Sequence, residues 1–289
     1  MVQLAVIMTC HNRRAVTLRC LRSLDAAAKR SDGMSYHVYL TDDGSTDDTS
    51  AAVEALGLPV TILSGPGDLF WNRGMVRAWE SAAVADTSYD AYMLLNDDTV
   101  LDDDALERLE AVERQTGGRA VVVGAVRDPD TGTLTYGGVR RLSTWHPGRV
   151  ATVGVHDHPQ SVDTFHANCV LVPSAVFATV GTLDPTYHHG MGDFDYGYRA
   201  REHGFHVIVA PRTVGTCARN RVDGTCRDPS LPLRRRLTLL ASPKGLPRRQ
   251  WHAFLMRHGA PAAYLLSWVP TLQVVFSWLS SSKRWKRSV

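Results

Sequence analysis

The sequence predicts an α/β fold built on a mostly parallel β-sheet, and three observations lead to this expectation. Short apolar runs typical of strands alternate with segments of helical periodicity over the first 220 residues. The 289-residue chain is 44% hydrophobic and 21% charged, a globular composition that argues against disorder and against a polytopic membrane protein. Polar clusters follow three of the expected strands, as at the ligand-binding edge of open α/β sheets.

The first 126 residues contain strands and helices in alternation, which predicts a parallel sheet covered on both faces. Apolar runs predict strands at Val2–Met8, Tyr36–Leu40, Val60–Leu63, Ala91–Leu95 and Ala120–Val126. Helical spacing of apolar residues covers Arg14–Lys29, Asn72–Val84 and Asp102–Gln115. The polar clusters lie at the carboxyl ends of the first, second and fourth strands, so we expect them to meet in space.

The next 100 residues differ in character. Residues 128–165 are rich in Gly, Thr and Arg with β-like alternation, which predicts a smaller mixed or antiparallel region. Two more strands (Ala167–Val172 and His206–Ala210) and two more helices (Ser174–Val180 and Asp193–His203) are expected after it.

Charge is divided unevenly along the chain. The net charge is +3, yet residues 230–289 contain eleven Lys or Arg and no acidic residue, which leaves −8 for residues 1–229. This division favours two partners: an anionic surface for the C-terminal part and a metal-chelated anion for the acidic body. The five cysteines lack zinc-finger or redox spacing, and the N-terminal apolar run is too short for a signal peptide. We therefore expect reduced thiols and a cytoplasmic protein.

Four local patterns occur in order along the first 220 residues: MTCHNR, LTDDGSTDDT, LLNDDTVL and GDFDYGYRAREHG. With them the chain resembles the family 2 glycosyltransferases, including bacterial rhamnosyltransferase-like and cell-surface polysaccharide enzymes. The resemblance implies the GT-A fold, a Rossmann-like fold that binds nucleotide-diphosphate sugars. It also implies a catalytic domain over residues 1–228, with a nucleotide-sugar-binding half (1–126) and an acceptor-binding half (127–228). Residues 229–289 would form a basic, amphipathic helical extension.

The strand-end clusters match the donor-binding motifs of the family. Asp42 is expected to accept the imide N–H of a uracil or thymine, and Asp43 to cap the turn or the following helix. Asn96 replaces the first Asp of the common Asp-x-Asp form, so it would contact ribose or a water. The residues implied in nucleotide-sugar binding are Thr9, His11, Asn12, Asp42, Asp43, Arg73, Asn96 and Asp97.

Asp98 matches the carboxylate that binds a divalent cation in this family. Mn²⁺ or Mg²⁺ prefers hard oxygen ligands and would bridge the diphosphate of the donor. Relatives often add a His after the last core strand, but this chain has Cys217 near that place, a soft ligand for Mg²⁺. Water, His188 or His189 would then complete the metal shell, although the two histidines fit an acceptor contact or a plain loop equally well.

Asp193 matches the general base of the family. It would deprotonate the acceptor hydroxyl while the sugar is transferred with inversion. Gly192 replaces the Glu that commonly precedes this Asp, which leaves Asp195 as a second catalytic candidate. The residues suggested for the sugar or acceptor pocket are Trp71, Asn168, His188 and His189.

The C-terminal part contains 24 residues, Gly259–Ser282, without a charged side chain. Five apolar residues fall on one helical stripe, with mostly polar residues opposite: Leu265, Trp268, Leu272, Phe276 and Leu279. Together with the basic and aromatic segment Lys283–Arg287, this pattern favours peripheral contact with an anionic membrane at its inner face. Packing against the core or a second subunit, and a true membrane span, remain alternatives. No motif indicates nucleic-acid binding.

The expected reaction moves a sugar from a UDP- or dTDP-sugar to a glycan or lipid-linked acceptor. Two other classes stay open at this point. A sugar nucleotidyltransferase usually has a Gly-rich pyrophosphate loop after the first strand, and residues 9–15 contain no Gly. A catalytically inactive membrane-associated module would explain the missing Glu and His.

Overall fold

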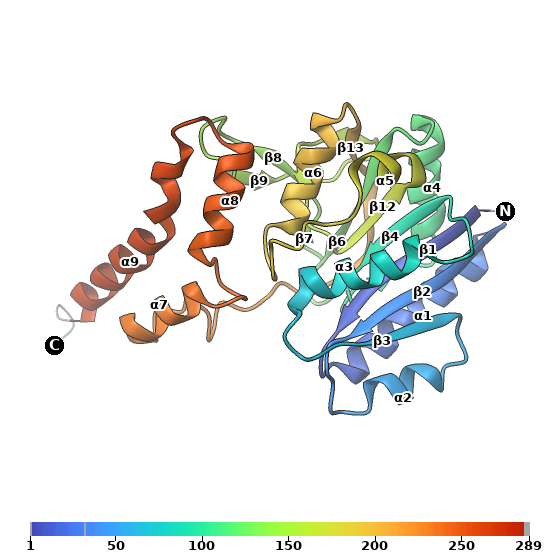
Figure 1. The fold of residues 1–289 in the computed structure, drawn as a ribbon, viewed down its shortest axis with the longest axis horizontal. Coiled ribbons are helices and arrows are strands. Elements are labelled where there is room, and N and C mark those ends of the chain that lie inside the picture. Colours follow the sequence, from blue (N-terminus) through green and yellow to red (C-terminus); the bar gives the residue numbers. More distant parts are fainter. Residues whose placement is uncertain (1, 32, 286–289) are drawn as a thin grey trace.

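The structure, a computed structural model, describes the backbone of residues 2–31 and 33–285 and the side chains as far as Ser280 (Figure 1). Its strands are β1 (Val2–Cys10), β2 (Met34–Asp42), β3 (Val60–Ser64), β4 (Ala91–Leu95), β5 (Val100–Leu101), β6 (Ala120–Arg127), β7 (Leu134–Tyr136), β8 (Gly138–Arg141), β9 (Val150–Thr152), β10 (Gln160–Ser161), β11 (Thr164–Phe165), β12 (Cys169–Pro173) and β13 (His206–Thr216). Its helices are α1 (Arg14–Arg30), α2 (Thr49–Glu54), α3 (Phe70–Ala83), α4 (Ala105–Thr116), α5 (Ser174–Val180), α6 (Gly192–Glu202), α7 (Leu233–Ala241), α8 (Arg248–His258), the 3₁₀ helix η1 (Ala263–Trp268) and α9 (Val269–Trp285).

Within these described residues, ten strands form one mixed sheet with a parallel core, as predicted. The main path of the sheet is β10-β13-β6-β12-β4-β1-β2-β3. β4, β1, β2 and β3 are mutually parallel, whereas β12 runs antiparallel between β4 and β6. The chain leaves β1 toward β2 and β3 on one side and returns to β4 on the other. Ligands bind at such a switch point, beyond the carboxyl ends of the strands.

Helices cover both faces of the large sheet. α1, α2 and α4 bury one apolar face, through residues such as Leu21, Val53 and Leu109. α3, α5 and α6 bury the other, where the fully buried Trp79 stacks on Phe177. Replacing a buried Trp of this kind by Ala typically costs about 3 to 5 kcal/mol. These two layers hold the strand ends in fixed relative positions.

Residues 138–165 contribute a second, three-stranded antiparallel sheet, β11-β8-β9. The smaller antiparallel region expected from the sequence is therefore confirmed.

Two predicted boundaries differ from the structure by three residues or more. β13 continues to Thr216 instead of ending at Ala210, across a register irregularity at which Arg212 has a left-handed φ of 56°. The helix expected from Asp102 begins at Ala105, because residues 100–101 pair with the end of β13 as β5. Both differences come from a pairing between distant segments that local periodicity does not report.

The C-terminal helices lie beside α6, on the side of the molecule away from the N-terminus (Figure 1). Phe194 and Tyr198 of α6 pack with Trp251 and Phe254 of α8 in a third apolar cluster. The uncharged segment 259–282 is divided between η1 and α9, with Pro270 in the first turn of α9, where its missing N–H is harmless. No helix in the described part of the chain is long and apolar enough to cross a bilayer. Lys283–Arg287 lies outside the residues whose side chains are described.

Candidate active site

The residues after β1 tie that strand to the loop after β2. Thr9 donates from Oγ1 to the carbonyl of Thr41 at 3.1 Å. His11 donates from Nδ1 to the carbonyl of Asp43 at 2.6 Å, and Asn12 Oδ1 accepts the N–H of Thr46 at 2.7 Å. The structure thus brings Thr9, His11 and Asn12 to the mouth of the switch point, as the sequence predicts, and gives each a role in holding the loop.

Asp42 and Asp43 are both buried, and their carboxylates hold different segments. Asp42 closes the turn after β2, because its Oδ1 accepts the N–H of Ser45 at 2.9 Å and its Oδ2 accepts the hydroxyl of Ser50. Asp43 reaches across to the loop before α3, where it accepts the N–H groups of Gly67 at 2.8 Å and Phe70 at 3.0 Å. Asp42, rather than Asp43, therefore closes the turn, and Asp43 positions the start of α3.

The first turn of α3 also contacts the motif after β4. Trp71 donates from its indole N–H to Asn96 Oδ1 at 2.7 Å, and the backbone N–H of Asn96 donates to the carbonyl of Asn168 at 3.0 Å. Asn96 is therefore oriented by Trp71 and by the start of β12.

Arg13 pairs with both carboxylates of the motif after β4. Its guanidinium lies 3.0 Å from Asp97 Oδ1 and 2.8 Å from Asp98 Oδ2. Burial raises the pKa of Asp97 to about 7, although the charge of Arg13 opposes this shift. The second oxygen of Asp97 is buried without a hydrogen-bond partner among the described residues. The carboxylate pair is thus only partly satisfied by the protein.

Cys217, at the end of β13, lies beside Asp98. Its thiol donates to Asp98 Oδ1 at 3.4 Å and accepts from the amide of Asn168 at 3.4 Å. Burial, and next the charge of Asp98, raise the pKa of the thiol to about 12. A thiol sulfur is also a soft ligand, which suits a hard cation such as Mg²⁺ poorly. Asn168 orients this thiol.

The residues present fit a weakly held divalent cation. Mg²⁺ and Mn²⁺ sites of this type use one or two carboxylates, and substrate phosphates and water supply the remaining ligands. Asp98 offers such a carboxylate at the carboxyl edge of the sheet, and the unpaired oxygen of Asp97 lies next to it. No group of three or more His, Cys, Asp or Glu gathers as a metal cage in the described residues. Phosphate and water oxygens would complete the coordination of an ion held by Asp98.

Asp193 begins α6 with few partners. Its Oδ1 accepts the N–H of Phe194 at 2.9 Å. Burial raises the pKa of Asp193, and the nearby His166 opposes the shift in part. Burial lowers the pKa of His166 in turn, and the ring lies 3.2 Å from the carbonyl of Gly137 through Nδ1. His166 was not predicted, because a single His in a β-like region carries no spacing signal.

These features agree with the comparison of the chain with known proteins. Residues 2–235 match the family model described as glycosyltransferase like family 2. The chain belongs to this family. No curated protein sequence matches it.

Solved structures of glycosyltransferases share its fold at low identity. The mannosyltransferase PcManGT from Pyrobaculum calidifontis, in complex with GDP-Man and Mn²⁺, has 16% identity and a TM-score of 0.56 over 97% of this chain and 73% of that one. GalNAc-T7 with UDP, GalNAc and Mn²⁺ has 14% identity and a TM-score of 0.57 over 77% of this chain and 44% of that one. TarS 1–349 of S. aureus with UDP has 12% identity and a TM-score of 0.54 over 89% and 72%. The GT-A fold predicted from the sequence is thereby confirmed.

Asn72 explains why this family member has Gly192 in place of Glu. The amide of Asn72 is fully buried and donates to the carbonyls of Asp184 at 2.8 Å and Tyr187 at 2.9 Å. A Cβ atom at position 192 would overlap its Oδ1. Met191, just before, has a left-handed φ of 76°, a conformation that costs a non-Gly residue about 1 to 3 kcal/mol. The start of α6 is thus fixed against α3, and Asn72 is a site residue that the sequence reasoning missed.

Asp195, two residues after Asp193, is fully buried and surrounded by donors. Its oxygens accept from Arg199 at 2.7 Å, Arg257 at 2.7 Å, His258 at 2.9 Å and the hydroxyl of Tyr187 at 3.2 Å. Burial alone would raise the pKa of Asp195, but the hydrogen bonds from His258 and Arg199 outweigh it and lower the pKa to about 2. This carboxylate joins α6 to α8 of the C-terminal extension.

The remaining predicted residues lie on the side of the extension. Arg73 donates from Nε to the carbonyl of Pro185 at 3.0 Å. His188 accepts the N–H of Asn72 through its carbonyl at 2.9 Å and donates its own N–H to Gln250 of α8 at 3.3 Å. Burial lowers the pKa of His189, whose Nδ1 has no partner among the described residues. Neither histidine joins Asp98 in a group of metal ligands in the described part of the chain.

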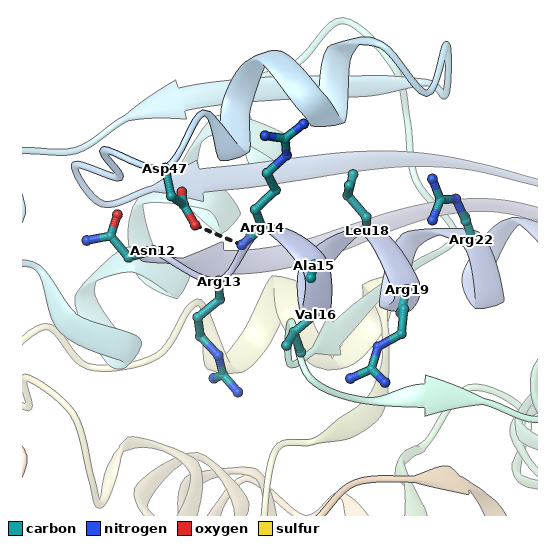
Figure 2. Close-up of a pocket in the computed structure, with 9 residues that line it drawn as sticks. All are labelled: Asn12, Arg13, Arg14, Ala15, Val16, Leu18, Arg19, Arg22 and Asp47. Carbon is teal, nitrogen blue, oxygen red and sulfur yellow. Dashed lines mark hydrogen bonds between the residues drawn. The ribbon is translucent and has the colours of Figure 1, made fainter.

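A shallow hollow of about 780 Å³ runs along α1 from Asn12 (Figure 2). Arg14, Arg19 and Arg22 line it at successive turns of the helix, and Asp47 accepts the backbone N–H of Arg14 at 3.0 Å. The hollow adds positive charge beside the strand-end residues.

Proposed function

We propose that this protein transfers a sugar, with inversion, from a nucleotide-diphosphate sugar to a hydroxyl acceptor with the help of a divalent cation. The observation that carries the proposal is the partly satisfied pair Asp97 and Asp98 at the switch point of a family 2 fold. Structures of the same fold contain Mn²⁺ with GDP-Man or with UDP, which supports a nucleotide-sugar donor. A UDP- or dTDP-sugar remains our choice, with Asp42 near the nucleobase.

In this mechanism Asp98 would hold the cation, and the cation would stabilise the negative charge that develops on the leaving diphosphate. Arg13 could neutralise the same diphosphate if its guanidinium moved away from Asp97 and Asp98. Asn96, oriented by Trp71, presents its amide toward the donor side of the motif.

Asp193 would be the general base. It takes the proton from the acceptor hydroxyl as that oxygen attacks the anomeric carbon from the face opposite the leaving group. A pKa raised by burial makes this carboxylate a stronger base than an exposed Asp. Asp195 is a poor alternative, because four donors stabilise its charged form and it is fully buried. The second catalytic candidate is therefore a positioning residue in our proposal.

The apolar stripe of the extension (Leu265, Trp268, Leu272, Phe276 and Leu279) is exposed, with Leu265 at 65% and Phe276 at 64% of their full exposure. The polar side of the same segment faces inward, because Ser267 is buried against His252 and Ser277 accepts from the buried Arg236 at 2.7 Å. A helix that turns its apolar side outward and has basic neighbours fits a membrane surface. We propose peripheral attachment to the inner face of an anionic membrane, with a glycan or lipid-linked acceptor there.

Two alternatives are disfavoured by specific features. Membership of family 2 argues against a sugar nucleotidyltransferase. An inactive module gives no reason for Asp193 to be held by backbone groups alone, those of Phe194 and Ala167, while side chains surround Asp195. A homo-oligomer formed through the apolar stripe would be recognised by mass measurements in solution.

Donor hydrolysis with and without Mn²⁺, over a panel of nucleotide sugars, tests the reaction. We expect turnover that requires the cation and is lost in Asp98→Ala and in Asp193→Asn, with circular dichroism unchanged. Wild-type turnover in both variants would contradict the assignment of Asp98 and Asp193.

Flotation with vesicles of anionic and zwitterionic lipid tests membrane attachment. Phe276→Ser should weaken binding to anionic vesicles, whereas Val84→Ser, at an exposed apolar residue elsewhere, should not.

A further inference from the structure

A second pocket, of about 410 Å³, lies between the catalytic body and the extension. Arg73 and His188 line it from the body, and Pro243, Arg249 and Gln250 line it from the extension. It is separate from the carboxylates of the 96–98 motif, which are not among its lining residues. The sequence suggested Arg73 for donor binding and His188 for the acceptor pocket, whereas the lining residues from the extension have no role in the proposed reaction.

The pocket presents hydrogen-bond donors and positive charge. Arg73 is fixed by one bond from Nε to Pro185, which leaves its terminal N–H groups without a partner among the described residues. Arg249 has no ion pair in the described part of the chain. Gln250 is 93% buried, and it accepts from the N–H of His188 while its amide nitrogen has no partner within the described residues. These groups match the oxygens of an anion.

No carboxylate lines the pocket to neutralise this charge. The nearby Asp184 is already paired with Arg257 at 2.6 Å, and Asp68, whose charge acts on His188, is exposed. The ring of His188 has its pKa lowered by burial and by Arg73, so the positive charge comes from the two guanidinium groups.

The first turn of α3 connects this pocket with the rest of the site. Successive residues of that turn contact Asp43 (through Phe70), Asn96 (through Trp71) and the start of α6 (through Asn72). Arg73 is the next residue, and it lines the pocket. The pocket is therefore placed beside the turn that fixes the candidate base, on the side away from the strand ends.

The opposite wall connects the pocket with the apolar stripe. The guanidinium of Arg248 lies 3.7 Å from the ring centroid of Trp268, an exposed member of the stripe. Arg249, the next residue of α8, lines the pocket. A ligand held by Arg249 thus lies between the first turn of α3 and the surface that we assign to the membrane.

We propose that this pocket binds a phosphoryl group carried by the acceptor, held between Arg73, Arg249 and the amide of Gln250. The proposal rests on the proposed glycosyl transfer and names the class of its acceptor: a phosphorylated molecule. The phosphoryl group belongs either to a lipid head group at the membrane or to a soluble sugar phosphate.

Calorimetric titration of the full chain with inorganic phosphate and with octyl phosphate tests the proposal. We expect Arg249→Gln to weaken the binding of these probes at least tenfold. Arg19→Gln, which removes an arginine from the hollow along α1, is the matched control and should leave the binding unchanged. Absent binding, equal binding by Arg249→Gln and wild type, or loss of binding in Arg19→Gln instead would overturn the proposal.

Two further measurements distinguish a lipid head group from a soluble sugar phosphate, and the phosphoryl pocket from the proposed glycosyl transfer. A lipid head group predicts that octyl phosphate binds more tightly than inorganic phosphate, and that Phe276→Ser abolishes this difference. A soluble sugar phosphate predicts equal binding of the two probes. Titration with UDP and Mn²⁺ should be unaffected by Arg249→Gln, and displacement of phosphate by UDP would assign the pocket to the donor and overturn the inference. Donor hydrolysis reports on the proposed function separately, since it needs no acceptor.

Discussion

Two carboxylate centres of this molecule differ in how many hydrogen-bond donors the protein provides for them. At Asp97 and Asp98, one arginine serves both carboxylates, a neighbouring thiol donates weakly, and one buried oxygen has no partner among the described residues. At Asp195, two arginines, a histidine and a tyrosine surround a single carboxylate. The first centre needs a ligand to be complete, whereas the second is already complete.

The contrast continues within α6 itself. Asp193 has a raised pKa and accepts only from the backbone groups of Phe194 and Ala167 among the described residues, and Asp195 has a pKa lowered to about 2. Of two aspartates in the first turn of one helix, the first therefore suits the proton transfer that we propose, and the second has a structural role. The number of donors around each carboxylate, rather than its burial alone, makes this difference.

The largest expected effect is on turnover in Asp193→Asn. Removing a general base typically lowers kcat by about 10² to 10⁴. The fold should be retained, because the amide preserves the shape and no partner charge is left unpaired. Steady-state kinetics and thermal melts check this, and a kcat close to that of wild type would show that the base lies elsewhere.

Asp195→Asn should act mainly on stability. It leaves Arg199, Arg257 and the buried His258 without the buried carboxylate that they share, and breaking a buried pair typically costs about 3 to 5 kcal/mol. Denaturant unfolding measures this loss. The control is Asp223→Asn, at an exposed pair with Arg221, which should change stability by less than about 1 kcal/mol. Equal effects of the two variants would remove the distinction between the centres.

The pH dependence of stability should follow the same carboxylate. The pKa of Asp195 in the folded protein, about 2, lies below the ordinary value of 3.8, so its contribution to stability is present above pH 4 and is lost as the pH falls toward 2. This difference in pKa corresponds to about 2 kcal/mol of folding free energy. The contribution of Asp193 to stability depends on pH in the opposite direction. Its pKa is raised, so stability falls as the pH rises above 3.8. Unfolding curves of the wild type and Asp195→Asn between pH 2 and 5 should diverge accordingly.

The smallest expected effect concerns the incomplete centre. Arg13→Gln removes the cation that pairs with Asp97 and Asp98, so Mn²⁺ alone should bind about tenfold more tightly, or about 1.4 kcal/mol. Mn²⁺ with UDP should bind less tightly, since the diphosphate loses a positive partner. Electron paramagnetic resonance titrations measure both constants. Unchanged constants would show that Arg13 neither competes with the cation nor contacts the diphosphate.

Much of the fold was predictable because it depends on local periodicity. The strand at Ala91–Leu95 and the helix at Ser174–Val180 have the predicted bounds, and the polar clusters after β1, β2 and β4 meet through a regular register in which Cys10 pairs with Asp42. The extension of β13 and the pairing of β5 were missed, because they depend on contacts between residues more than 100 positions apart.

The candidate site was predictable as a set of positions, but not as a set of contacts. His166 and Asn72 carry no local signal, although Asn72 explains the glycine at position 192. The proximity of Cys217 to Asp98 was anticipated from the family pattern, whereas the pairing of Arg13 with both carboxylates was not.

By itself the sequence determined which segments are strands, which ends are polar and which face of the last helix is apolar. Only the tertiary structure decided which aspartate of α6 is surrounded by donors, and that the apolar stripe faces outward while its serines face the protein. The physical reason is that periodicity records the spacing of side chains along one element. The partner that each face meets depends on elements far away in the chain, here α8 for Asp195 and α7 for Ser277.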